Sequence, residues 1–122
     1  MLVRLGFCVV LALAIVAPQR ARAADCAQEI SRLMSRVTEK LTTRFNRVSK
    51  RIQKQGASRR LVAEECRIAR QLKPRLENQL AALKQSGCIK DPQMGRMIAD
   101  IVHGHEDDLA TVRKTAAKSE CH

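Results

Sequence analysis

Seven apolar residues between positions 30 and 52 recur at steps of four, three, four, four, three and four, the spacing of one face of an α-helix. A half-buried strand would instead show apolar residues at every second position. A second set of seven repeats the same steps between positions 94 and 116. The two sets predict two long amphipathic helices, with the seams Ile30, Met34, Val37, Leu41, Phe45, Val48 and Ile52, and Met94, Ile98, Ile101, His105, Leu109, Val112 and Ala116.

A third helix is expected between these two, from about residue 59 to about residue 85, because leucine and isoleucine recur there at helical spacing. Gly56 suits the end of the first helix, Ser58 the start of the second and Gly87 its end. Asp91 followed by Pro92 predicts the start of the last helix. We therefore expect an all-α fold, an antiparallel up-down-up three-helix bundle.

Pro74 falls inside the middle helix. Proline has no amide hydrogen, and its ring clashes with the carbonyl group four positions earlier, here that of Arg70. We therefore expect the middle helix to be kinked at Pro74 or broken into two shorter helices.

The first 23 residues have the charged, apolar and small-residue zones of a secretory signal peptide. The apolar run covers residues 5–17, which is shorter than the about 20 residues that a membrane-spanning helix needs. Ala21 and Ala23 fit the small-residue positions of a cleavage site. We expect residues 1–23 to be a signal peptide and residues 24–122 to form a single helical domain, periplasmic or secreted, with no transmembrane segment in the mature form.

Four cysteines remain after removal of the predicted leader, which carries the fifth. An even number in a short exported chain predicts disulfides. In an up-down-up bundle, Cys26 at the start of the first helix lies at the same end as Cys88, which follows the second helix. Cys66 and Cys121 lie toward the other end. We therefore predict the pairs Cys26–Cys88 and Cys66–Cys121, the second of which requires the tail after Lys118 to fold back.

Basic residues are concentrated in the first half of the expected domain: residues 24–75 hold 14 lysines and arginines against 5 acids, whereas residues 76–122 hold 6 against 7. On the first helix they form a stripe beside the apolar seam, and the stripe continues at the start of the second helix. Rows of such groups bind phosphate and carboxylate through charge and paired hydrogen bonds. We expect the stripe to dock an anionic component of the cell envelope or an acidic protein surface; its residues are Arg32, Arg36, Lys40, Arg44, Arg47, Arg51, Lys54, Arg59 and Arg60.

Three alternatives to this function remain open. The stripe is also compatible with a solvated helix face that the acidic residues 106–108 partly neutralise. The chain is compatible with a periplasmic chaperone-like or stress-related helical protein. It is compatible as well with a structural, self-associating envelope protein, a homo-oligomer in which the acidic patch of one copy meets the basic stripe of another.

No pattern in the sequence indicates catalysis. His103 and His105 point to nearly opposite sides of a helix, so they cannot close one metal site with Asp107 without ligands from elsewhere. The only aromatic residue of the expected domain, Phe45, belongs to the apolar seam and is not available for stacking on bases. We therefore expect no enzyme activity, no catalytic residue, no cofactor, no bound metal and no sequence-specific nucleic-acid binding.

Overall fold

A computed structural model describes residues 25–122, and the predicted signal peptide lies outside them. The described residues form helices and turns without a strand, so the all-α prediction is confirmed. None of their helices is long and apolar enough to cross a bilayer. The elements are an N-terminal helical segment at residues 25–33, α2 (Arg36–Gln55), α3 (Arg59–Gln85), the short 3₁₀ helix η1 (Gly87–Lys90), α4 (Gly95–Ala116) and a second 3₁₀ helix η2 (Ser119–Cys121).

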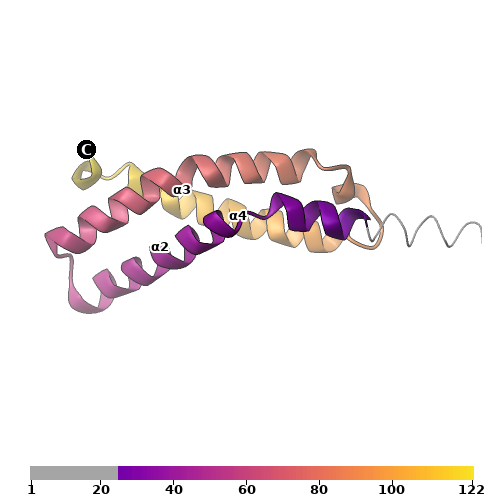
Figure 1. The fold of residues 1–122 in the computed structure, drawn as a ribbon. Coiled ribbons are helices and arrows are strands. Elements are labelled where there is room, and N and C mark those ends of the chain that lie inside the picture. The colour runs from indigo at the N-terminus through magenta and orange to yellow at the C-terminus, as the bar shows by residue number, and fades with distance from the viewer. Residues whose placement is uncertain (1–24) are drawn as a thin grey trace, which may run out of the picture.

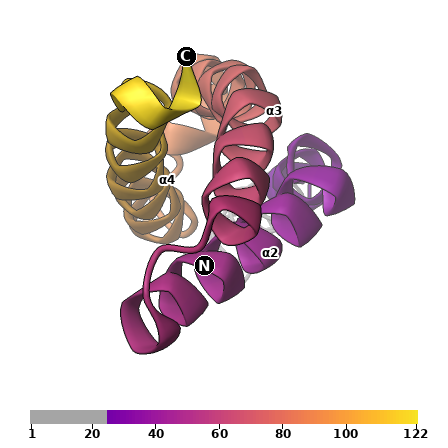
Figure 2. The same ribbon diagram turned by 90° about the vertical axis from the view of Figure 1, so that its left-hand side faces the viewer.

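The central element is α3, because both α2 and α4 pack against it. Figure 1 shows consecutive long helices running in alternate directions, and Figure 2 shows α2 and α4 on different sides of α3, with α2 crossing it obliquely. Each fully buried aliphatic side chain contributes about 2 kcal/mol through removal from water. Most of the largest such side chains belong to α3, and the set is Ile68, Leu72, Leu76, Leu83, Ile98 and Val112.

The first predicted helix is interrupted, which corrects the expectation of one uninterrupted seam. Helical structure stops at residue 33, and Ser35 caps α2 by accepting a hydrogen bond from the Thr38 amide at 3.4 Å. The interruption shifts the helical phase, so Met34 and Val37 are 37% and 50% exposed while Thr38 takes an inward position. The other seam residues are buried or half-buried as predicted: Ile30, Leu41, Phe45, Val48 and Ile52.

Pro74 does not break α3, which continues from Arg59 to Gln85 with the proline inside it. Figure 1 shows one helix whose path bends between its two halves. Leu72 and Leu76, two residues on either side of the proline, are fully buried. Their packing offsets the about 3 kcal/mol that an interior proline costs, and this explains why the helix bends instead of ending.

The connection between α2 and α3 follows the predicted turn chemistry. Gly56 has a positive φ of 90° and donates its amide hydrogen to the Ile52 carbonyl at 2.9 Å. Ser58 then caps α3 by accepting a hydrogen bond from the Leu61 amide at 3.2 Å. The reversal is therefore specified locally, by residues within one turn of it.

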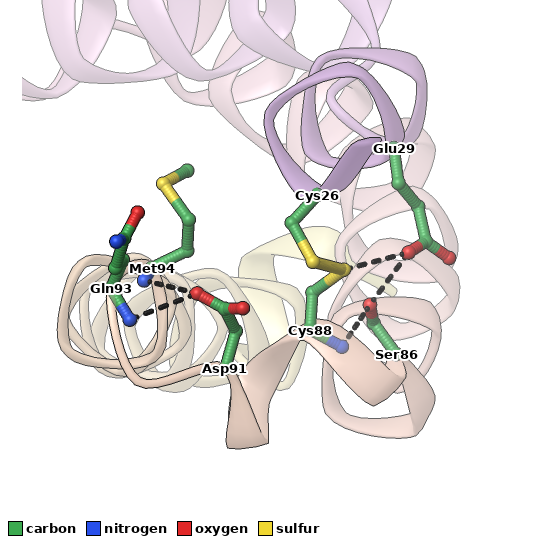
Figure 3. Close-up of a disulfide and its surroundings, with 7 residues drawn as sticks. All are labelled: Cys26, Glu29, Ser86, Cys88, Asp91, Gln93 and Met94. Atoms are coloured by element: carbon green, nitrogen blue, oxygen red, sulfur yellow. Dashed lines mark hydrogen bonds between the residues drawn. A yellow bond between two sulfur atoms is a disulfide. The ribbon is translucent and has the colours of Figure 1, made fainter. Parts of the chain in front are cut away.

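Asp91 lies just before the turn that leads into α4, and the continuous α-helix begins later than predicted, at Gly95. One carboxylate oxygen, Oδ2, accepts hydrogen bonds from the Gln93 amide at 2.9 Å and the Met94 amide at 2.8 Å (Figure 3). Asp91 therefore caps the turn that leads into α4, whereas the N-cap position of the helix itself is Met94, three residues later than the sequence predicted.

Two disulfides link the ends of the fold, and they join the same cysteines as predicted. Cys26–Cys88 connects the segment 25–33 to η1, and Cys66–Cys121 connects α3 to η2. The chain turns after Ala116 so that η2 packs on α3. The bridges span 62 and 55 positions, and loops of that size correspond to about 4 kcal/mol each in the chain-entropy account. Neither bridge includes a residue of α2.

Candidate functional site

All nine residues of the predicted basic stripe have exposed side chains. Arg32 belongs to the segment 25–33, and Arg59 and Arg60 begin α3, so the break at Ser35 and the turn at Gly56 separate these three from α2. The other six extend from residue 36 to residue 54, a length of about 27 Å along the helix axis. They form what we call the basic face: Arg36, Lys40, Arg44, Arg47, Arg51 and Lys54.

Only one member of the basic face has a carboxylate within ion-pair distance among the described residues. Arg44 Nη2 lies 3.6 Å from Glu64 Oε1, and this pair ties one flank of α2 to α3. Because both side chains are partly exposed, the pair contributes at most about 1 kcal/mol. The helix contains a single acid, Glu39, so the described fold leaves most of the positive charge of α2 uncancelled.

The acidic residues of α4 do not neutralise the basic face. Glu106 forms an ion pair with Lys84 of α3 at 2.9 Å, and the hydrogen bond and charge of Lys84 lower the pKa of Glu106. Asp107 is exposed, and Asp108 lines a groove beside α2. The interpretation of the stripe as a face partly neutralised by these acids therefore finds no supporting contact in the described residues.

A groove of about 200 Å³ lies between α2 and α4, over α3. The sequence did not predict it, because its walls come from elements far apart along the chain. It lies on the side of α3 where α2 crosses that helix obliquely (Figure 2). Apolar atoms make up most of its exposed lining, although eight of its ten residues have polar side chains: Met34, Ser35, Thr38, Glu39, Thr42, Thr43, Leu76, Gln79, His105 and Asp108.

One edge of the groove is held by Gln79, which is only 8% exposed. Its Oε1 accepts a hydrogen bond from the Ser35 amide at 3.0 Å, while its Nε2 lies 2.6 Å from His105 Nε2 and 3.6 Å from Met34 Sδ. Since the Ser35 amide can only donate, it fixes the orientation of the Gln79 amide, and Nε2 must be the donor to His105. We call Gln79 and these three partners the Gln79 hub. It joins the break before α2 to both α3 and α4.

The hub also assigns the tautomer of His105. The ring Nδ1 lies 3.0 Å from the Ile101 carbonyl oxygen, so it carries the hydrogen, and Nε2 accepts from Gln79. His105 was predicted as a member of the apolar seam, and the structure shows both of its ring nitrogens engaged in hydrogen bonds. In the described part of the chain, no group of three or more His, Cys, Asp or Glu side chains is placed to hold a metal ion.

The Cys26–Cys88 disulfide has a carboxylate beside it (Figure 3). Glu29 Oε2 lies 3.0 Å from Cys88 Sγ and accepts a hydrogen bond from the Ser86 hydroxyl at 3.2 Å. A disulfide sulfur has no hydrogen, so the sulfur–oxygen approach is a contact and not a hydrogen bond. Reactive cysteines lie in electropositive surroundings, whereas this carboxylate repels an approaching thiolate. The arrangement suits a structural bridge.

Comparison of the chain with protein-family models, with curated proteins and with solved structures gives no match. The basic face and the groove are the two features of the described residues whose charge and geometry point to binding.

Proposed function

We propose that this chain is an exported, non-catalytic binding protein whose basic face docks an anionic component of the cell envelope or an acidic protein surface. The observation that carries this function is the row of exposed cations on α2, of which only Arg44 is paired with a carboxylate among the described residues. Two disulfides favour an oxidising compartment and so support export after removal of the leader, with residues 24–122 as one three-helix domain.

The dimensions of the basic face favour an extended anionic surface over a small anion. Its members extend about 27 Å along one helix, and rows of separate charges attract a partner that carries several phosphates or carboxylates. The bases of a nucleic acid would find no exposed aromatic side chain to stack on, because Phe45, the only aromatic residue after the leader, is 2% exposed. Contacts limited to charge favour a partner recognised by its anionic groups alone.

A chaperone-like role has less support from the described surface. Holding unfolded clients requires a continuous apolar patch. Among the described residues, the only large apolar side chains that are exposed are Met34, Val37 and Met97. Charge is therefore the stronger candidate for the driving force of binding.

A vesicle assay with charge-matched variants tests this function. The protein, purified with both disulfides formed, is sedimented with vesicles containing phosphatidylglycerol and with vesicles of phosphatidylcholine alone, and poly-glutamate serves as a soluble acidic polymer. The face variant replaces Arg36, Lys40, Arg47 and Arg51 with glutamate. The control variant makes the same change in net charge at exposed cations outside the basic face: Lys73, Lys90, Arg96 and Lys114.

We expect the wild-type protein and the control variant to bind one of the anionic probes and the face variant to lose binding. Each basic residue near an anionic membrane contributes about 1 kcal/mol, so four reversals lower the affinity about a thousandfold. Binding should also weaken as ionic strength rises toward about 0.15 M, where the Debye length is about 8 Å. Equal binding by the two variants, with both folded by circular dichroism, would contradict a role for the basic face.

A further inference from the structure

The groove differs in chemistry from the rest of the α2 surface, because most of its free polar atoms are hydrogen-bond acceptors. The Thr42 hydroxyl donates to the Thr38 carbonyl at 2.9 Å, and the Thr43 hydroxyl donates to the Glu39 carbonyl at 3.0 Å. With their hydrogens engaged, both hydroxyl oxygens retain only lone pairs. The carboxylates of Glu39 and Asp108 add further acceptors, and neither has an ion-pair partner among the described residues.

Thr38 supplies a second, independent sign that the groove takes a ligand. This residue is only 3% exposed and lines the groove. Its amide and carbonyl are bonded to Ser35 and Thr42, but its hydroxyl has no hydrogen-bond partner in the part of the chain that the structure describes. That part contains no fully buried side-chain oxygen or nitrogen left without a partner. The Thr38 hydroxyl therefore opens onto the groove, where a ligand or solvent must satisfy it.

We propose that the groove binds an organic cation, an ammonium or guanidinium group on a short alkyl chain. Such a group brings several N–H donors and a positive charge, which match the acceptors of Thr42 and Thr43 and the carboxylates of Glu39 and Asp108. A volume of about 200 Å³ is below the range of drug-sized sites and suits a group as small as a lysine or arginine side chain. The cation is either a free amine or a basic side chain of a second copy of this chain.

The surroundings of Asp108 agree with this ligand class. Burial raises the pKa of Asp108 above its ordinary value, while the neighbouring His105 acts in the opposite direction and Asp107 adds to the increase. The charged or titratable groups that face it are these two from α4 and Glu39 from α2, because the α3 lining, Leu76 and Gln79, carries no charge. A bound cation offsets the cost of ionising Asp108. The affinity of the groove for the cation should therefore rise as Asp108 loses its proton with increasing pH.

The test is an NMR titration of the disulfide-bonded protein with n-butylamine and n-butylguanidinium, followed through backbone amide signals. The groove variant combines Glu39→Gln with Asp108→Asn, and Thr38→Val removes the free hydroxyl at nearly constant volume. The matched control combines Glu120→Gln with Asp100→Asn, two exposed acids that lie outside the groove. All three variants keep the shapes of the side chains, and one-dimensional spectra check that each is folded.

We expect saturable shifts centred on residues 38–43 and 105–108, an affinity at least about tenfold lower in the groove variant, and an unchanged affinity in the control. Shifts spread evenly over all exposed acids, the same affinity in the groove variant and the control, or no saturable shift would overturn the assignment. Because these variants leave every cation of the basic face intact, failure here is distinguishable from failure of the vesicle assay.

Sedimentation velocity in the presence and absence of n-butylguanidinium identifies the source of the cation. A dimer that the probe dissociates and that the groove variant abolishes indicates a basic side chain from a second copy. A monomer that binds the probe in the NMR titration indicates a free amine.

Discussion

Replacing Gln79 with methionine should destabilise the fold by about 2 kcal/mol. Methionine keeps the length and approximate volume of the side chain, so the change removes hydrogen bonds and leaves packing almost intact. The Ser35 amide and His105 Nε2 each lose a partner, and one intramolecular hydrogen bond contributes about 1 kcal/mol net. In a domain of about 100 residues, each kcal/mol shifts the Tm by about 4–8 °C, so the Tm should fall by about 8–16 °C.

Thermal unfolding followed by circular dichroism, with both disulfides intact, measures this change. The matched control is Gln71→Met, an exposed glutamine of the same helix, which should change stability by less than about 0.5 kcal/mol. Hydrogen exchange at the Ser35 amide should accelerate only in Gln79→Met, because that amide is bonded to Gln79. If both variants unfold at the same temperature and Ser35 exchanges at the wild-type rate, the hub does not hold α2 in the way its geometry indicates.

Two further predictions concern a disulfide and an ionisable group. Replacing Cys66 and Cys121 with alanine should lower the free energy of unfolding by up to about 4 kcal/mol in urea titrations, and a variant as stable as wild type would contradict a stabilising bridge. Burial raises the pKa of Asp108 in the folded state, so ionisation of this carboxyl group opposes folding above that pKa. Asp108→Asn should therefore stabilise the ligand-free protein at neutral pH. Below the ordinary value of 3.8 the group is protonated in both states, so the advantage of Asp108→Asn should vanish in melts at about pH 3.

Sequence periodicity predicted the buried face of a helix well where the helix is continuous. Ile98, Leu109 and Val112 of the last seam are buried in α4, because spacing alone fixes which residues share a face. The break before α2 was not predicted, because Met34 and Val37 preserve the apolar steps across it. What stabilises the break is the bond from the Ser35 amide to Gln79, 44 positions away, and no local pattern reports such a contact.

The two candidate sites, the basic face and the groove, also differ in how far the sequence alone predicts them. Exposure of the basic face follows from the position of the apolar seam on α2, since cations that lie beside the seam fall outside the buried face and reach water. The groove depends on the angle at which α2 crosses α3, which is set by packing between residues distant in sequence. The continuity of α3 at Pro74 likewise depends on packing between residues distant in sequence. Burial of Leu72 and Leu76 keeps the helix continuous despite the proline between them.

The basic face and the groove adjoin on α2, where Glu39 and Thr43 line the groove and also lie among Arg36, Lys40, Arg44 and Arg47 of the basic face. The helix α2 contains no cysteine. It is held by packing on α3 and by side-chain bonds such as that from the Ser49 hydroxyl to Glu65 at 2.9 Å. One bridge joins the segment before α2 to η1, and the other joins α3 to η2, so no disulfide fixes the orientation of α2, which depends on non-covalent contacts. A cation bound between Glu39 and Asp108 would add a link from α2 to α4, which this helix otherwise contacts little. Occupation of the groove would therefore restrict the same helix that presents the basic face, and the two sites would be coupled through its orientation.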